Sequence, residues 1–163
     1  MAAFGRDELG GRSPSEKRLP SLRGDFRFWT EEKLRNADTD QFRHVNNAAI
    51  ATFFEAARME IFAPSAIRAL MGGANLAVVR LLIEFNTELH FPGHVRVGST
   101  VIEVGNTSLK VRQGLFGGAD DGCYSTAEAI CVLVHGDTGR PCPVAPELRE
   151  YLLTGDGGTE AFV

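Results

Sequence analysis

The sequence has little of what marks several common classes of protein. Its three cysteines, an odd number in a chain of 163 residues, do not make a disulfide framework. No apolar run approaches the roughly 18 residues that a membrane helix needs. Lysine and arginine number 17 against 21 acidic residues, so no basic surplus exists to neutralise nucleic acid. The N-terminus, MAAFGRDELGGRSPSEKR, carries charges where a signal peptide needs an apolar segment, and we expect a cytoplasmic protein.

Three widespread motifs are also missing. The chain contains no G-x-S-x-G, no Walker A sequence and no C-x-x-C. Serine-hydrolase, P-loop and redox-dithiol chemistry therefore have no support in the sequence.

What the chain contains fits one globular domain between two polar ends. Glycines and prolines break up residues 1–24, and this arm buries too little apolar surface to order itself. Residues 154–163, TGDGGTEAFV, form a similar tail. We therefore predict a domain over 25–153, which is long enough to bury one core.

Hydrophobic periodicity predicts one strand, one buried helix and four further strands. The first strand covers 25–34, with Phe26 and Phe28 on one face. The helix runs from about Asn47 to Phe62, ends before Pro64, and is apolar enough around its circumference to be largely enclosed. The remaining predicted elements are a short helix over 65–71, strands over 76–91, 94–104, 107–116 and 123–135, and a terminal helix that begins at Pro146.

Short turns between the later strands indicate antiparallel pairing. One sheet of about five strands wrapped around one apolar helix is an α+β arrangement. Such a sheet leaves two unpaired edges, and pairing between two copies of the chain removes an edge from each.

The segment from Asp38 to Asn47 contains most of the candidate catalytic side chains, namely two acids, a histidine and two asparagines. It reads DTDQFRHVNN and leads directly into the predicted helix, which Asn46 or Asn47 can cap. Free N–H groups at a helix start can stabilise an oxyanion, and a carboxylate beside them can act as base or nucleophile. A purely capping role for these residues is the simpler alternative. A metal site made of Asp38, Asp40 and His44 matches no recognised ligand spacing, so we expect neither metal nor cofactor.

Three segments resemble the hot-dog-fold acyl-CoA thioesterases, in the broad group of the 4-hydroxybenzoyl-CoA thioesterases. They are D-T-D-x-x-x-H-V-N-N with its helix ending in FFEAARMEIF, then IEFNTELHFPGHVRVGSTV, and DTGRPCPVAPELREYL. The first is also similar to the plant acyl-ACP thioesterase motif. The resemblance covers about 25–152 and implies a five-stranded antiparallel sheet around a central helix. It also implies hydrolysis of a thioester to a free acid and CoA, in a homodimer or homotetramer with sites at the subunit interface.

The resemblance carries its functional residues onto the same segment. The family's catalytic carboxylate matches Asp40, and the backbone amide that polarises the thioester carbonyl matches Asn47. His44 matches a histidine of the acyl-ACP branch, where it assists water or orients the carboxylate. That branch has an asparagine where this chain has Phe42, so this chain departs from its mechanism.

Other acids are secondary candidates. An acid of the acyl-ACP branch would match Glu88, but strict alternation places Glu88 on the polar face of its strand, away from the helix, unless a bulge or the bend of the strand re-aims it. Glu55 and Glu60 lie in the helix, and Glu55 can pair with Arg58, which favours a structural role. The remaining histidines, His90, His94 and His135, are expected to be structural or solvated.

Two other functions stay open at this point. An acyl-CoA dehydratase of the same fold pairs its histidine and acid at a different spacing, and a non-catalytic acyl-CoA-binding module would keep the pocket without turnover. The sequence does not choose among the candidate contacts of the substrate, which are Arg80, Arg96 and Arg112 for the CoA phosphates and Phe42, Phe53 and Phe54 for the acyl group.

Overall fold

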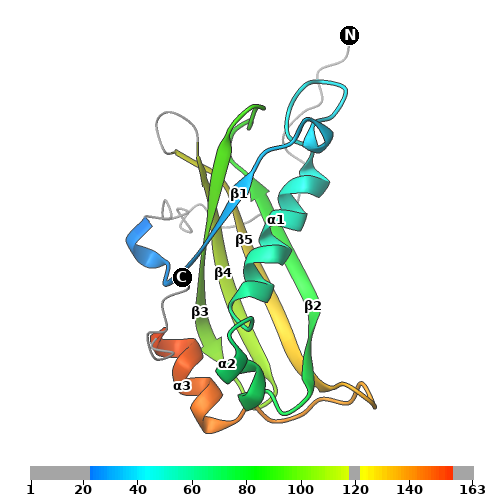
Figure 1. Ribbon diagram of the computed structural model, residues 1–163, viewed down its shortest axis with the longest axis vertical. Coiled ribbons are helices and arrows are strands. Elements are labelled where there is room, and N and C mark those ends of the chain that lie inside the picture. The colour runs from blue at the N-terminus through cyan, green and yellow to red at the C-terminus, as the bar shows by residue number, and fades with distance from the viewer. Residues whose placement is uncertain (1–22, 118–121, 156–163) are drawn as a thin grey trace, which may run out of the picture.

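A five-stranded antiparallel sheet curves around one long helix, α1 (Asn47–Glu60), in the computed structural model (Figure 1). The strands lie in the order β1–β3–β4–β5–β2. This is the hot-dog arrangement expected from the sequence. The structure describes residues 23–117 and 122–155, so the predicted arm and tail lie almost wholly outside the described residues.

Most elements agree with the predicted ranges to within a few residues. Helix α1 begins at Asn47 and β3 spans the range predicted for it. No helix in the described part of the chain is long and apolar enough to cross a membrane. The other elements are the 3-10 helices η1 (Arg23–Asp25) and η2 (Asn36–Asp38), the strands β1 (Phe28–Lys33), β2 (Ala74–Phe85), β3 (His94–Val104), β4 (Ser108–Gly117) and β5 (Gly122–His135), and the helices α2 (Ser65–Leu70) and α3 (Pro146–Thr154).

Strand β1 begins at Phe28, three residues later than predicted. Phe26 precedes the strand and packs against the neighbouring strands. Phe26 lies against Gly98 and Gly114, which are direct partners across β3 and β4. A Cβ atom at these glycines would come within 2.6 and 2.9 Å of the Phe26 ring. Phe28 points to the side of α1 and contacts Tyr151, with ring centroids 5.6 Å apart. The prediction that Phe26 and Phe28 share a face is therefore wrong.

Strand β2 ends at Phe85, well before the predicted end at Phe91. Beyond Phe85 the chain leaves the ladder, and the N–H groups of Asn86 and Thr87 both donate to the Tyr124 carbonyl, at 2.9 and 3.3 Å. The segment 87–91 then turns toward the loop that precedes α1. Alternation within β2 therefore says nothing about where the side chains of this segment point.

The predicted buried face of β2 is also largely exposed. A register shift between Val78 and Arg80 breaks the alternation, and β2 lies at the edge of the sheet. Val79, Leu81 and Phe85 are 62%, 40% and 46% exposed. An edge strand with this much apolar surface is a ready partner for another chain.

Helix α1 is covered on one face only. Ile50, Phe53, Phe54 and Ala57 are buried against the sheet, whereas Met59 on the other side is 51% exposed. The prediction that the helix is enclosed around its circumference does not hold within a single chain.

A buried polar layer joins α1 to the sheet. The Gln113 side chain in β4 donates to the Phe54 carbonyl and the Ser99 hydroxyl, both at 2.9 Å. Its carbonyl oxygen accepts a hydrogen bond from Arg58 at 2.8 Å. Burial lowers the pKa of the Arg58 guanidinium. The Arg58 guanidinium therefore donates its hydrogen bond to Gln113 inside the protein, while Glu55, the partner considered from the sequence, acts on it through its charge.

Replacing Gln113 tests this layer. Gln113→Leu should lower the free energy of unfolding by about 2–4 kcal/mol, because it leaves the buried Arg58 guanidinium without its acceptor and the Ser99 hydroxyl without its donor. Urea unfolding measures the change. Arg112→Leu, on the exposed side of the same strand, should shift it by less than about 0.5 kcal/mol. Equal losses in the two variants would contradict the role of the layer.

Candidate active site

The loop between η2 and α1 is fastened to the fold by backbone hydrogen bonds. The Asn46 N–H donates to the Asp38 carbonyl, and the Val45 N–H donates to the Leu89 carbonyl, both at 2.7 Å. These two bonds fix the position of the turn formed by residues 40–44. The loop therefore enters α1 in one defined direction.

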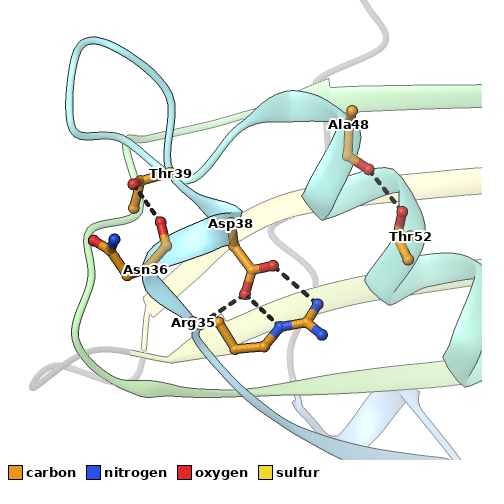
Figure 2. A network of polar contacts seen from close by, with 6 residues as sticks. All are labelled: Arg35, Asn36, Asp38, Thr39, Ala48 and Thr52. Atoms are coloured by element: carbon orange, nitrogen blue, oxygen red, sulfur yellow. Dashed lines mark hydrogen bonds and ion pairs between the residues drawn. The ribbon is translucent and has the colours of Figure 1, made fainter.

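Asp38 fastens the start of this loop and is only 6% exposed. Its carboxylate accepts hydrogen bonds from the Arg35 backbone N–H at 2.7 Å and from the Arg35 guanidinium at 2.9 and 3.2 Å (Figure 2). Burial opposes ionisation of this carboxyl, but the hydrogen bonds and charge of Arg35 outweigh that effect and lower the pKa of Asp38. Both of its oxygens are engaged, which leaves the metal alternative with Asp40 and His44 without support.

The Asp38 anchor should make the fold sensitive to acid. A carboxyl whose pKa is lowered by folding stabilises the protein above its unfolded pKa and loses that contribution as pH falls through the folded pKa. Asp38→Asn should cost about 1 kcal/mol at neutral pH, since the Arg35 side chain is 69% exposed and solvent screens the pair. Urea unfolding measured from pH 7 downward should show this difference shrinking below about pH 5.

The control for this anchor is Asp137→Asn, at an exposed residue that follows β5. It should change stability little at any of these pH values. A cost of Asp38→Asn that stays constant down to low pH would contradict the anchor.

Asp40 shapes the turn that it belongs to. Its Oδ1 accepts from the N–H groups of Phe42 at 2.8 Å and His44 at 3.2 Å, and its own N–H donates to the His44 carbonyl at 2.9 Å. Arg43 completes the turn in the left-handed backbone region, with φ of 65°. Within 23–117 and 122–155, nothing donates a hydrogen bond to Asp40 Oδ2. That oxygen is left for water or a substrate.

Helix α1 presents an N–H group next to this loop. Asn46 is the cap, and its side-chain oxygen accepts from the Ala48 N–H at 2.8 Å. The N–H of Asn47, the first helical residue, donates to no acceptor among the residues that the structure describes. An N–H at this position, at the positive end of the helix dipole, favours a negatively charged oxygen.

The structure brings His44, Glu88 and His90 together. The Nε2 atoms of His44 and His90 lie 3.4 and 3.6 Å from the same Glu88 oxygen. The two imidazoles meet edge to face, with centroids 5.0 Å apart. Strict alternation, which would place Glu88 away from the helix, does not apply, because β2 ends at Phe85 and the chain beyond it turns Glu88 toward His44. Sequence reasoning also missed His90, whose position follows from a backbone bridge to His44.

A pocket of about 450 Å³ adjoins this cluster. Its size is in the range that holds small organic groups. The predicted acyl contacts do not line it, since Phe53 and Phe54 are core residues and Phe42 is 67% exposed. The pocket is lined by Leu34, Leu89, Pro92, Gly93 and Tyr124, together with Glu88, His90 and His94.

The remaining predicted residues lie away from the loop. Glu60 accepts a hydrogen bond from Thr30 of β1 at 2.8 Å, and Glu55 lies exposed about 12 Å along the helix from Asn47. The strand register places the side chains of Arg80, Arg96 and Arg112 on the sheet face opposite α1.

Comparisons with known proteins agree with this architecture. A family model described as the thioesterase-like superfamily matches residues 34–152. The chain is similar to a predicted thioesterase from Bacillus stearothermophilus, with 26% identity, a TM-score of 0.68, and coverage of 77% of this chain and 92% of that one. A comparison with curated proteins found no significant match.

Two further solved structures share the fold. A DHNA-CoA thioesterase from Staphylococcus aureus is 21% identical, with a TM-score of 0.66 and coverage of 76% of this chain and 86% of that one. A thioesterase from Thermus thermophilus, complexed with coenzyme A and Zn, is 24% identical, with a TM-score of 0.67 and coverage of 78% of this chain and 92% of that one.

Proposed function

We propose that this chain, which belongs to the thioesterase-like superfamily, hydrolyses acyl-CoA thioesters to a free carboxylic acid and CoA. The family match spans every residue of the candidate site. The observation that carries the proposal is the junction of the loop with α1. There, among the residues that the structure describes, the N–H of Asn47 has no acceptor and follows a turn that holds Asp40 with one carboxylate oxygen free.

Asp40 is the reacting carboxylate in this proposal. As a base, it takes a proton from water while the water oxygen attacks the thioester carbonyl carbon. The Asn47 N–H then stabilises the oxyanion, the C–S bond breaks, and the CoA thiolate leaves and is protonated. As a nucleophile, Asp40 would instead form an anhydride with the acyl group, which water then hydrolyses.

His44 and Glu88 have supporting roles. Glu88 lies 3.4 Å from the His44 Nε2 atom and helps to orient the imidazole. His44 in turn directs water toward the carbonyl carbon. The 450 Å³ pocket beside Glu88 is suited to part of the substrate.

Asp40→Asn tests the catalytic role directly. Asparagine keeps an oxygen for the turn but cannot act as base or nucleophile, so kcat should fall at least about 10²-fold. Free thiol is followed with a panel of acyl-CoAs, and thermal unfolding checks that the variant is folded. Asp137→Asn serves as a matched control and should keep full activity. Unchanged turnover in Asp40→Asn would remove Asp40 from the mechanism.

The same assays separate the other two functions. Hydration of an enoyl-CoA without release of thiol would make the protein a dehydratase of this fold. Tight binding of acyl-CoA without any turnover would make it a binding module. We also propose a cytoplasmic location, in keeping with the free thiols of Cys123, Cys131 and Cys142.

We further propose that the protein is a homodimer paired through β2. This edge strand exposes Val78, Val79, Leu81 and Phe85 by 40–62%, and a second copy would cover them while extending the sheet. The exposed side of α1 at Met59 is a further apolar surface that a second copy can cover.

A charge on β2 should separate the subunits. Val79→Asp is expected to convert the dimer to a monomer in light scattering coupled to size-exclusion chromatography, because pairing would bury an unpartnered carboxylate. Ile102→Asp, at a residue of β3 that is 37% exposed, should leave the dimer intact. A wild-type protein that is monomeric at micromolar concentration would contradict the pairing.

A further inference from the structure

We propose that His44, Glu88 and His90 form a binding site for a divalent transition metal, best suited to zinc, and that zinc bound there inhibits the enzyme. The binding of zinc does not depend on whether the protein hydrolyses thioesters. The inhibition rests on the proposed function, because it acts through His44.

The donor set matches zinc chemistry. Two imidazole nitrogens and one carboxylate oxygen lie within 4.8 Å of one another. Zinc favours such nitrogen and oxygen ligands, and three protein ligands leave a fourth position for water or another small ligand. Magnesium and calcium prefer all-oxygen sites, so the two histidines select against them.

The spacing also fits a metal ion better than a direct contact. With metal–ligand bonds of about 2.0–2.2 Å, the ligand atoms of a tetrahedral site lie about 3.3–3.5 Å apart. The Glu88 oxygen is 3.4 Å from His44 Nε2 and 3.6 Å from His90 Nε2. Both separations exceed the usual N–H···O range of about 2.7–3.2 Å. The Glu88 oxygen is therefore spaced from each imidazole as two ligands of one ion are, and the ligand atoms of the two imidazoles lie within 4.8 Å of each other.

The backbone holds the donors in this arrangement. His44 and His90 are partners in an isolated antiparallel bridge, and the neighbouring Val45 N–H donates to the Leu89 carbonyl at 2.7 Å. Glu88 and His90 are two residues apart in this bridged segment, which is compatible with side chains on the same side. The side chains of His44, Glu88 and His90 are 34%, 66% and 57% exposed, so an ion can reach them without unfolding.

An ion at this site would remove the groups that orient water. It would occupy His44 Nε2 and the Glu88 carboxylate at the rim of the pocket, which Glu88 and His90 line. Asp40 would keep its place in the turn, because its Oδ1 binds backbone N–H groups only. Zinc should therefore lower turnover without unfolding the loop.

Metal binding is measured on the metal-free full chain by isothermal titration with zinc, and by the visible absorption of added cobalt(II). One zinc should bind per chain. His90→Gln and Glu88→Gln should each weaken binding at least about tenfold, since loss of even an outer-shell partner of a metal site costs about 10–100-fold. His135→Gln, at an exposed histidine outside the cluster, should bind zinc as the wild type does. Equal affinity in wild type and His90→Gln would overturn the site.

Inhibition is measured as the ratio of each protein's rate in zinc to its own rate in EDTA. Acyl-CoA is followed by chromatography, because zinc also binds the released thiol. His90→Gln should need at least about tenfold more zinc than the wild type or His135→Gln for the same inhibition. Site-specific binding with unchanged or raised turnover would overturn the inhibition. Zinc binding by a protein that hydrolyses no acyl-CoA in EDTA would contradict the proposed function and the inhibition while supporting the site.

Discussion

Two backbone hydrogen bonds of 2.7 Å fix the start of helix α1, one from Asn46 to Asp38 and one from Val45 to Leu89. The first closes the loop on itself, and the second ties it to the segment that follows β2. Together they set the direction of the helix, the position of the turn at Asp40 and the meeting of the two histidines. Loss of either bond would loosen the position of the helix start relative to the polar side chains of the loop.

In the proposed mechanism, a single residue of the loop has both a structural and a chemical role. Asp40 uses one oxygen to form its turn, and within the described part of the chain its other oxygen accepts no hydrogen bond, while both oxygens of Asp38 are engaged by Arg35. We therefore assign the two acids of this motif different roles, because among the described residues Asp38 is paired with a cation and Asp40 is not. The proposed chemistry depends on that difference, since a carboxylate already paired to a guanidinium is a weak base.

Local patterns predicted most of the fold. The helix start at Asn47, the range of β3 and the antiparallel sheet all follow from periodicity and turn residues within short windows. The predictions from sequence were wrong where residues far away in the chain determine how a side chain is oriented. Phe26 packs against a pair of glycines on two other strands, and Arg58 turns inward because Gln113 accepts its hydrogen bond there. The motif predicted Asp40, His44 and Asn47, but the position of Glu88 depends on where β2 leaves the sheet, which alternation does not reveal.

The proposed function requires the thioester carbonyl to bind at the start of α1, beside Asp40. A crystal structure with a non-hydrolysable acyl-CoA analogue tests it most directly. The account predicts the analogue's carbonyl oxygen within hydrogen-bond distance of the Asn47 N–H, with the free oxygen of Asp40 facing the carbonyl carbon directly or through one water. A reactive group bound elsewhere, with Asp40 exposed to bulk solvent, would contradict it.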